Sequence, residues 1–167
     1  MSPSWPALAL IAVVAMQRLV ELAIARHNTT RLLAQGGREV GANHYPLIVA
    51  LHAAWLAALL VFGWQNQMSL PFVAIYVLLQ LFRVWVLLSL GDRWTTRIIV
   101  LDAPPVRRGP YRFVAHPNYL LVAAEIAAVP LALNLLVVAL VFTLLNAAAM
   151  AIRIPVEQAA LTASRHP

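Results

Sequence analysis

Long runs of apolar residues divide the sequence, and they constrain the fold more than any other feature. A helix needs about 20 apolar residues to cross the hydrocarbon core of a bilayer. Five runs approach that length, at about residues 5–25, 46–64, 70–90, 118–133 and 135–152. Apolar residues make up 62% of the chain, against roughly half in soluble domains. The sequence therefore predicts an all-α integral membrane protein with about five transmembrane helices.

The first and last of these runs have distinctive flanks. No basic residue precedes the first run, which continues into Arg26 without a small-residue cleavage site, so we do not expect a cleavable signal peptide. The last two runs are short, and Pro130 and Asn134 separate them without a charged or glycine-rich linker. They predict a tight helical hairpin.

The placement of arginine predicts the orientation. All twelve cationic residues are arginine, and ten lie after the first, third and fifth runs, whereas the opposite connections carry none. These ten are Arg26, Arg31, Arg38, Arg93, Arg97, Arg107, Arg108, Arg112, Arg153 and Arg165. Because cytoplasmic segments accumulate arginine, we expect the N-terminus outside, the C-terminus in the cytoplasm and an odd number of crossings.

Two regions follow from this topology. Residues 1–90 are expected to form three transmembrane helices with a polar cytoplasmic loop at 26–45, and residues 91–167 to form a second region with the longest cytoplasmic segment, the hairpin and the C-terminal segment. Arginines dispersed among apolar runs cannot build a basic groove, which excludes nucleic acid as a partner. No cysteine is present. His44 and His52 are eight apart, which matches no common metal-binding spacing, so we expect no metal site.

A polar motif marks the expected start of the fourth helix. Pro117 suits a first helical turn because its missing N–H would be unpaired there anyway. His116 and Tyr119 are three residues apart and are expected on the same side of that turn. Such a helix N-terminus would attract an anionic ligand group. The alternative is an interfacial aromatic belt with a helix-start proline.

A second motif follows the fifth run. Arg153 and Glu157 are four residues apart, so one interpretation is a surface ion pair worth a few tenths of a kcal/mol. The other is functional: the hairpin brings this guanidinium and carboxylate to the same membrane depth as the first motif.

Ionisable residues inside the apolar runs are candidates for function, since burying them in a membrane is costly. Glu125 and Arg83 are predicted to pair across helices, with Gln80 nearby, although either could instead contact a substrate. Arg18 and Glu21 are three apart and are expected to neutralise each other.

The order of these motifs resembles a known family. Gly109-x-Tyr111, His116-Pro117-Asn118-Tyr119, a helical hairpin and Arg153-x-x-x-Glu157 resemble the catalytic core of the isoprenylcysteine carboxyl methyltransferase family. These are membrane enzymes that use S-adenosylmethionine. The resemblance covers about residues 91–161. The first polar loop resembles a bacterial branch, some of whose members lie beside type III polyketide synthases and O-methylate alkylpyrones or phenolic lipids.

The resemblance implies roles for individual residues. It implies that Arg153 faces the methyl acceptor and that residues 103–106, ending at Val106, line the cofactor. It further implies cofactor contacts from Tyr111, His116, Pro117, Asn118, Tyr119 and Glu157. Ala115 and Gln158 depart from the family pattern, which usually has Arg and Glu there. Either Arg107, Arg108 or Arg112 compensates for Ala115, or the activity is altered.

The acceptor determines which chemistry is needed. A carboxylate would require only orientation by Arg153, whereas a phenol or enol must lose a proton, for which His116 or Glu125 could serve. We expect a lipophilic acceptor that enters from the surrounding membrane lipids. A prenylcysteine, a fatty acid, an alkylpyrone and a phenolic lipid all remain open, with protein prenylcysteine the least favoured.

The sequence thus predicts a multi-pass, cell-membrane O-methyltransferase dependent on S-adenosylmethionine. One alternative is an NADPH-dependent lipid or sterol reductase, since such enzymes also carry a His-Pro-Asn-Tyr motif. They typically continue with Gly-Asp, where this chain has Leu120-Leu121. A second alternative is a non-catalytic scaffold or lipid-binding protein.

Overall fold

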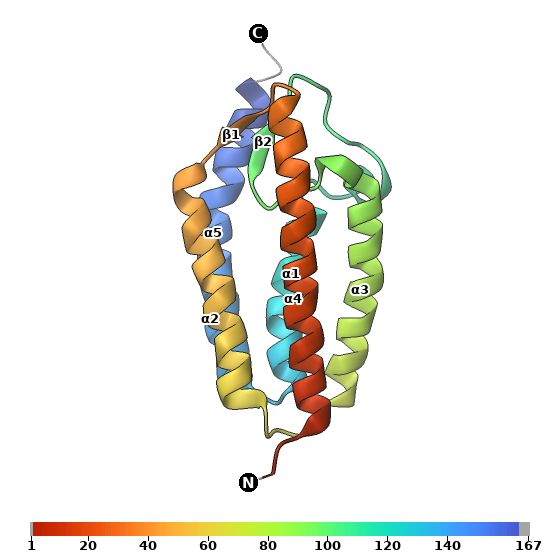
Figure 1. Cartoon of the computed structure of the whole chain (residues 1–167), viewed down its shortest axis with the longest axis vertical. Helices are drawn as coiled ribbons and strands as arrows, with labels where there is room; N and C mark the ends of the chain where they lie inside the picture. The colour runs from red at the N-terminus through yellow and green to blue at the C-terminus, as the bar shows by residue number, and fades with distance from the viewer. Residues whose placement is uncertain (1, 164–167) are drawn as a thin grey trace.

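Five long helices run alternately up and down along the long axis of the molecule (Figure 1). The computed structural model describes residues 2–163. The helices are α1 (Trp5–Ala34), α2 (Tyr45–Gly63), α3 (Leu70–Leu90), α4 (Pro117–Ala132) and α5 (Leu136–Ala163). Because their number is odd, the two chain ends lie at opposite ends of the molecule, the N-terminus at the bottom of Figure 1 and the C-terminus at the top.

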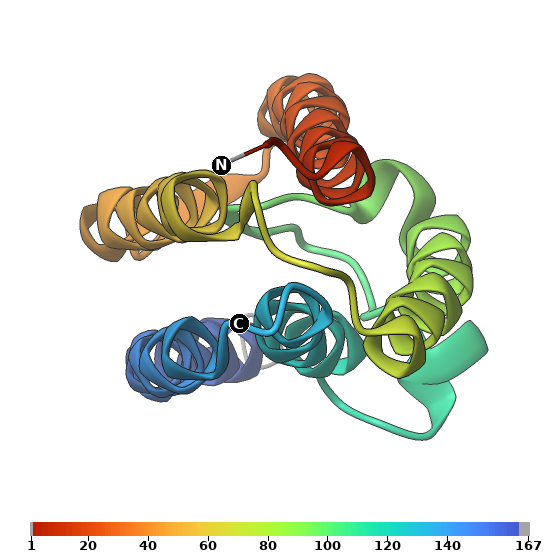
Figure 2. The same ribbon diagram turned by 90° about the horizontal axis from the view of Figure 1, so that it is seen from below.

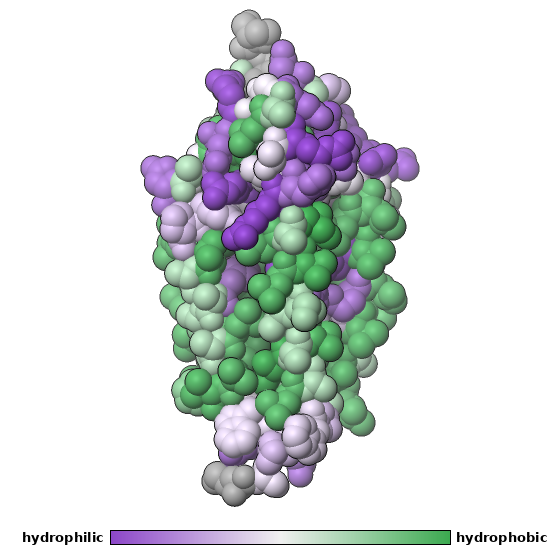
Figure 3. Space-filling model, in the orientation of Figure 1, coloured by the Kyte–Doolittle hydropathy of each residue, from purple (hydrophilic) through white to green (hydrophobic). Residues whose placement is uncertain are grey.

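A broad apolar band crosses the face of the bundle seen in Figure 3, and hydrophilic residues gather above it. Four helical segments are long and apolar enough to cross a membrane: Trp5–Ala34, Ala42–Gly63, Leu70–Arg93 and Leu136–Ala163. α4 has only 16 residues, about 24 Å at 1.5 Å per residue, against a hydrocarbon core of roughly 30 Å. It packs against both α3 and α5 (Figure 2), so neighbouring helices cover much of it.

The predicted hairpin of the last two helices is confirmed. Asn134 makes the turn with a positive φ of 57°, and the carbonyl of Pro130 accepts the N–H of Leu135 at 2.9 Å. α5 does not end at residue 152 as predicted but continues to Ala163, with Pro155 inside it. Only α4 of this pair is therefore short.

The polar loop predicted at residues 26–45 is mostly helical, which corrects the sequence interpretation. α1 continues to Ala34 because no helix-breaking residue occurs before Gly36, where φ is +89°. Asn28 lies on the buried side of this extension and donates a hydrogen bond of 2.9 Å to the carbonyl of Trp94. A short 3-10 helix, η1 (Ala42–His44), then leads into α2.

Two short strands also modify the all-α prediction. β1 (Arg38–Val40) pairs antiparallel with β2 (Ile98–Val100), with Glu39 opposite Ile99. This ribbon joins the connection after α1 to the connection after α3, at the end of the bundle where the hydrophilic residues gather. Two further 3-10 helices, η2 (Gly91–Arg93) and η3 (Gly109–Arg112), flank β2 in the chain.

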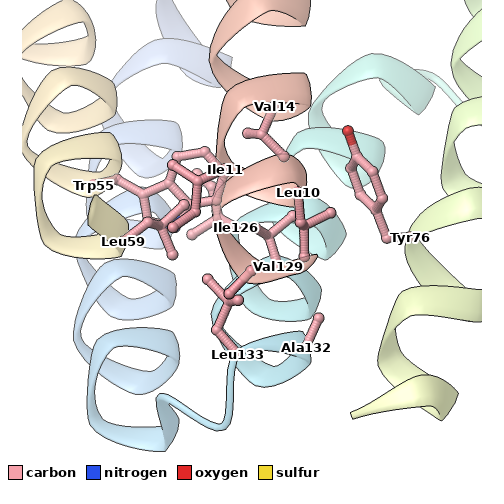
Figure 4. Packing of buried hydrophobic residues seen from close by; sticks show 11 residues of the cluster. Leu10, Ile11, Val14, Trp55, Leu59, Tyr76, Ile126, Val129, Ala132 and Leu133 are labelled. Atoms are coloured by element: carbon pink, nitrogen blue, oxygen red, sulfur yellow. The ribbon is translucent and has the colours of Figure 1, made fainter. Parts of the chain in front are cut away.

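The lower half of the bundle contains an apolar core (Figure 4). Its largest buried side chains come from four helices and include Trp55 and Leu59 from α2 and Ile126 and Val129 from α4. Leu10, Ile11 and Val14 of α1 complete this packing. In a membrane the surrounding lipid is as apolar as these side chains, so they stabilise the bundle through close van der Waals packing.

A network of buried ion pairs connects α1, α3 and α4 above this core. The predicted pair of Arg83 and Glu125 is present, as is the pair of Arg18 and Glu21 at 2.9 Å. The two pairs are also joined, because Arg18 contacts Glu125 at 2.6 Å and Arg83 contacts Glu21 at 2.9 Å. Gln80 donates a further hydrogen bond of 2.9 Å to Glu125. Two guanidinium groups and two carboxylates thus neutralise each other.

Candidate functional site

The connection between α3 and α4 folds over the arginine-rich end of the bundle. Arg93 donates a hydrogen bond of 2.6 Å to the carbonyl of Pro104, and Arg108 donates one of 2.7 Å to the carbonyl of Ser89. The indole N–H of Trp94 lies 3.4 Å from the side-chain oxygen of Asn118. The first contact folds the connection on itself, the second holds it to α3, and the third holds it against the first turn of α4.

That first turn has the arrangement expected from the sequence. Pro117 is the first residue of α4, and His116 precedes it without a side-chain capping bond. The rings of His116 and Tyr119 stack with centroids 5.3 Å apart and planes 15° apart. Pro117 itself is buried and serves to start the helix.

Arg153 is held by two different elements. Its Nε donates to the hydroxyl of Tyr119 at 2.8 Å, and its Nη2 donates to the carbonyl of Thr96 at 2.8 Å. The hydroxyl of Tyr119 donates in turn to the carboxylate of Glu157. Arg153 is only 5% exposed, so the predicted alternative of a surface pair between Arg153 and Glu157 is wrong. Tyr119 instead lies between them.

Two cavities adjoin this arrangement. The cap cavity, of about 230 Å³, lies between the connection and the ends of α4 and α5. Its polar residues include Arg93, Arg97, Tyr111, His116 and Glu157. Its apolar residues are Leu32, Leu90, Ile98, Ile99, Leu101, Ala103, Pro105, Val106, Ala115 and Leu161. It therefore combines charges of both signs with a large apolar surface.

The bundle cavity, of about 190 Å³, lies between the helices. Its sides are largely apolar, from Leu22, Ile48, Val49, Val122 and Met150. Its polar residues at one end come from α1, α2 and α3, and they are Arg18, Glu21, His52 and Arg83. Tyr45 and Thr96 also line it, and their hydroxyls are 3.0 Å apart.

The same five residues line both cavities. This shared wall consists of Trp94, Thr95, Asn118, Tyr119 and Arg153. Two ligands, one in each cavity, would therefore approach each other at the guanidinium of Arg153 and the ring of Tyr119.

The surroundings of the cap cavity change the pKa of Tyr111. Burial raises the pKa of the Tyr111 phenol above its usual value, and the nearby negative charge of Glu157 raises it further. Tyr111 therefore keeps its proton at physiological pH and remains a hydrogen-bond donor within the cavity.

Most of the predicted site residues line one of these cavities, but two do not. Tyr111, His116, Asn118, Tyr119, Glu157, Val106 and Arg153 line the cap cavity. Pro117 is not among the lining residues, and Glu125 is fully buried within the ion-pair network.

The two departures from the family pattern also lie at this site. Ala115 lines the cap cavity, and Gln158 reaches within 3.4 Å of the His116 ring. Arg107, Arg108 and Arg112 were predicted as replacements for the missing arginine, but none lines this cavity. Arg93 and Arg97 do, because the connection folds back across α1 and α5.

Several lining residues were missed by sequence reasoning. Trp94 and Thr96 lie in a segment whose fold depends on pairing with β1, 60 residues away in the chain. The guanidinium carbon of Arg97 lies over the ring of Tyr45, 4.4 Å from the ring centroid. His52 shares a helix face with Tyr45, Ile48 and Val49. The sequence shows this spacing, but it does not show which helices that face packs against.

Comparisons with known proteins identify the family of this chain. The profile of the isoprenylcysteine carboxyl methyltransferase (ICMT) family matches residues 72–163. The chain is 37% identical over 158 residues to the uncharacterized protein YpbQ of Bacillus subtilis (strain 168), covering 91% of this chain and 94% of that protein. No solved structure matches significantly. The chain belongs to the isoprenylcysteine carboxyl methyltransferase family of membrane methyltransferases.

Proposed function

We propose that this protein uses S-adenosylmethionine to methylate a carboxyl or hydroxyl oxygen of a lipophilic small molecule at the cell membrane. One observation carries the proposal: two cavities of different character meet at the shared wall. Holding two reactants in alignment is a principal contribution of an enzyme to group transfer. The cap cavity would hold the cofactor, and the bundle cavity would hold the acceptor.

The residues of the cap cavity suit the charges of this cofactor. The carboxylate of Glu157 would bind the ammonium group in a charge-assisted hydrogen bond. Arg93 and Arg97 line the same cavity and would attract the cofactor carboxylate, as would the N-terminus of α4. Leu101 and Tyr111 offer apolar and aromatic surface to the adenine. When bound, the cofactor supplies a methyl group attached to a positively charged sulfur.

The bundle cavity suits a lipophilic acceptor. Apolar side chains from α1, α2, α4 and α5 form its sides. Val49 is 45% exposed on the surface of α2 and also lines the cavity. We infer that an acceptor enters from the membrane beside α2.

Arg153 would orient the acceptor oxygen. Neither predicted proton acceptor lines the bundle cavity: His116 lines only the cap cavity, and Glu125 is buried in ion pairs. The guanidinium of Arg153 would stabilise an acceptor that binds as an anion, either a carboxylate or an acidic hydroxyl. We therefore assign His116 to the cofactor side and Glu125 to structural stability.

Membership of a methyltransferase family favours this function over a reductase. A calorimetric titration of the full-length protein in detergent tests it directly. We expect S-adenosylhomocysteine, the product form of the cofactor, to bind. Absence of binding by the unmutated protein would overturn the proposal and leave a scaffold role. Preferential binding of NADPH would instead support the reductase.

Glu157→Gln is expected to weaken S-adenosylhomocysteine binding. A hydrogen bond to a charged group is worth about 1.5–3 kcal/mol, which corresponds to roughly 10–100-fold in affinity. His116→Ala is expected to weaken binding as well. Asp102→Asn is the matched control, because Asp102 is exposed beside the cap cavity without lining it. Equal effects of Glu157→Gln and the control would contradict the assignment of Glu157.

A further inference from the structure

His52 is a polar residue of the bundle cavity that the proposed function does not yet use. It lies on the inner face of α2, seven residues after Tyr45, which places it about 10 Å farther along the helix axis. Tyr45 marks the level of the shared wall, because its hydroxyl contacts that of Thr96. His52 therefore lies deeper in the cavity than Arg153.

The tautomer of His52 is determined by a backbone contact. Its Nδ1 lies 2.8 Å from the carbonyl oxygen of Ile48. A carbonyl oxygen can only accept a hydrogen bond, so Nδ1 must carry the proton. In the neutral ring, Nε2 is then a hydrogen-bond acceptor. Within residues 2–163 it has no hydrogen-bond partner, and it is not sealed off as a buried atom.

The surroundings of His52 are polar although the sides of the cavity are apolar. Arg18, Glu21 and Arg83 line the same end. Both carboxylate oxygens of Glu21 are already engaged by these arginines and by Gln17. Arg18 keeps one buried Nε–H without a partner in the described part of the chain. The deep end thus offers a hydrogen-bond acceptor at Nε2, whereas the N–H of Arg18 is sealed off from the cavity.

We propose that His52 selects acceptors with a second hydroxyl group, which donates a hydrogen bond to Nε2 while the methylated oxygen lies at the shared wall. An acceptor with a plain hydrocarbon end would bury Nε2 without a partner, which is unfavourable. Side chains on a helix lean toward its N-terminus, so the His52 ring leans back toward Arg153. The second hydroxyl is therefore expected on the head group itself rather than at the far end of the hydrocarbon chain.

This inference rests on the proposed function, and the test separates the two. An alkylresorcinol has two ring hydroxyls, and the alkylphenol of equal chain length has one. The affinity of each for the full-length protein in detergent is measured from quenching of tryptophan fluorescence, in parallel with calorimetric S-adenosylhomocysteine binding. We expect the alkylresorcinol to bind roughly 3–10-fold more tightly, the range for one additional neutral hydrogen bond.

Variants of His52 test whether this residue causes the preference for the alkylresorcinol. His52→Leu is expected to reduce the preference to about one-fold, because it removes the nitrogen that an alkylphenol would bury without a partner and so strengthens alkylphenol binding. His52 does not line the cap cavity, so S-adenosylhomocysteine binding should be retained, which verifies the fold. His52→Gln is expected to restore part of the preference, since its amide oxygen accepts a hydrogen bond. His27→Leu, an exposed histidine on α1, is the matched control and should retain the preference.

The outcomes are distinguishable. Equal affinity of the unmutated protein for both compounds, or a preference that survives in His52→Leu, overturns the role of His52 even if S-adenosylhomocysteine binds. Failure of S-adenosylhomocysteine to bind the unmutated protein overturns the proposed function itself.

Discussion

At the scale of single residues, Glu125 has an unusual position for a carboxylate. It is fully buried and accepts hydrogen bonds from Arg18, Gln80 and Arg83. A base must present a free lone pair to its substrate, whereas the oxygens of Glu125 are occupied from three sides. Its charge instead balances two guanidinium groups that would otherwise lie unpaired in an apolar interior.

Glu125→Gln is therefore expected to destabilise the protein. Removing one partner of a buried ion pair typically costs 3–5 kcal/mol, so thermal unfolding in detergent should shift clearly to lower temperature. Asp92→Asn is the control, because Asp92 forms an exposed pair with Arg31 at 3.1 Å, a kind worth about 0–1 kcal/mol. Equal shifts for the two variants would refute the structural role. Loss of turnover without loss of stability would instead indicate that Glu125 acts as a proton acceptor.

The residue contacts that could be predicted were those within one helix turn or between two membrane-embedded opposite charges. Arg18 with Glu21, and Arg83 with Glu125, follow from that logic alone. The contact of Arg18 with Glu125 joins residues 107 apart. It requires knowing that α1 packs beside α4, which no local pattern encodes. The same reason explains why His52 was not recognised as a cavity residue.

At the scale of elements, the shape of the cap cavity depends on a glycine at the start of η3. Gly109 has a φ of +58°, and a Cβ at that position would lie 1.9 Å from the Oγ of Ser89. The backbone of η3 thus packs directly on α3. This close approach places Tyr111, two residues later, in the cap cavity.

Gly109→Ala is expected to displace η3 and to weaken S-adenosylhomocysteine binding by roughly tenfold or more, since a β-carbon meets both the strained conformation and Ser89. Gly36→Ala is the matched control. Its φ is also positive, at +89°, but a Cβ there would meet nothing within 4 Å. The control should lose about 1 kcal/mol of stability and keep its binding. Comparable binding losses in both variants would show that positive φ alone matters.

The elements that could be predicted were those formed by a long run of apolar residues. The helical runs were located well because length and hydropathy identify a membrane helix. The strands β1 and β2 have three residues each, too few for an alternating pattern. The polar extension of α1 beyond residue 25 was missed because its residues look like a loop. They are nonetheless helical, because Asn28 and Leu32 are buried against the connection between α3 and α4.

At the scale of the whole molecule, residues of the connection between α3 and α4 line both cavities, and hydrophilic residues gather at that end (Figure 3). The arginines outside the bundle interior come from the end of α1 and from the connections at that end, Arg153 of α5 is buried beside them, and Arg165 lies outside the described residues. Their common location follows from alternating helix directions. If cytoplasmic segments accumulate arginine, the cap cavity faces the compartment that supplies the proposed cofactor.

This orientation can be measured because the chain contains no cysteine, so a single introduced thiol is the only reactive site. Gln67 and Asp102 are both exposed, Gln67 in the connection between α2 and α3 and Asp102 in the connection between α3 and α4. These connections lie at opposite ends of the bundle (Figure 1). In intact cells, a membrane-impermeant maleimide should label Gln67→Cys but not Asp102→Cys, and permeabilisation should expose both. The reverse pattern would place the cap cavity outside the cell, away from the cytoplasm. That result would contradict the predicted topology and, with it, the use of a cytoplasmic cofactor at this site.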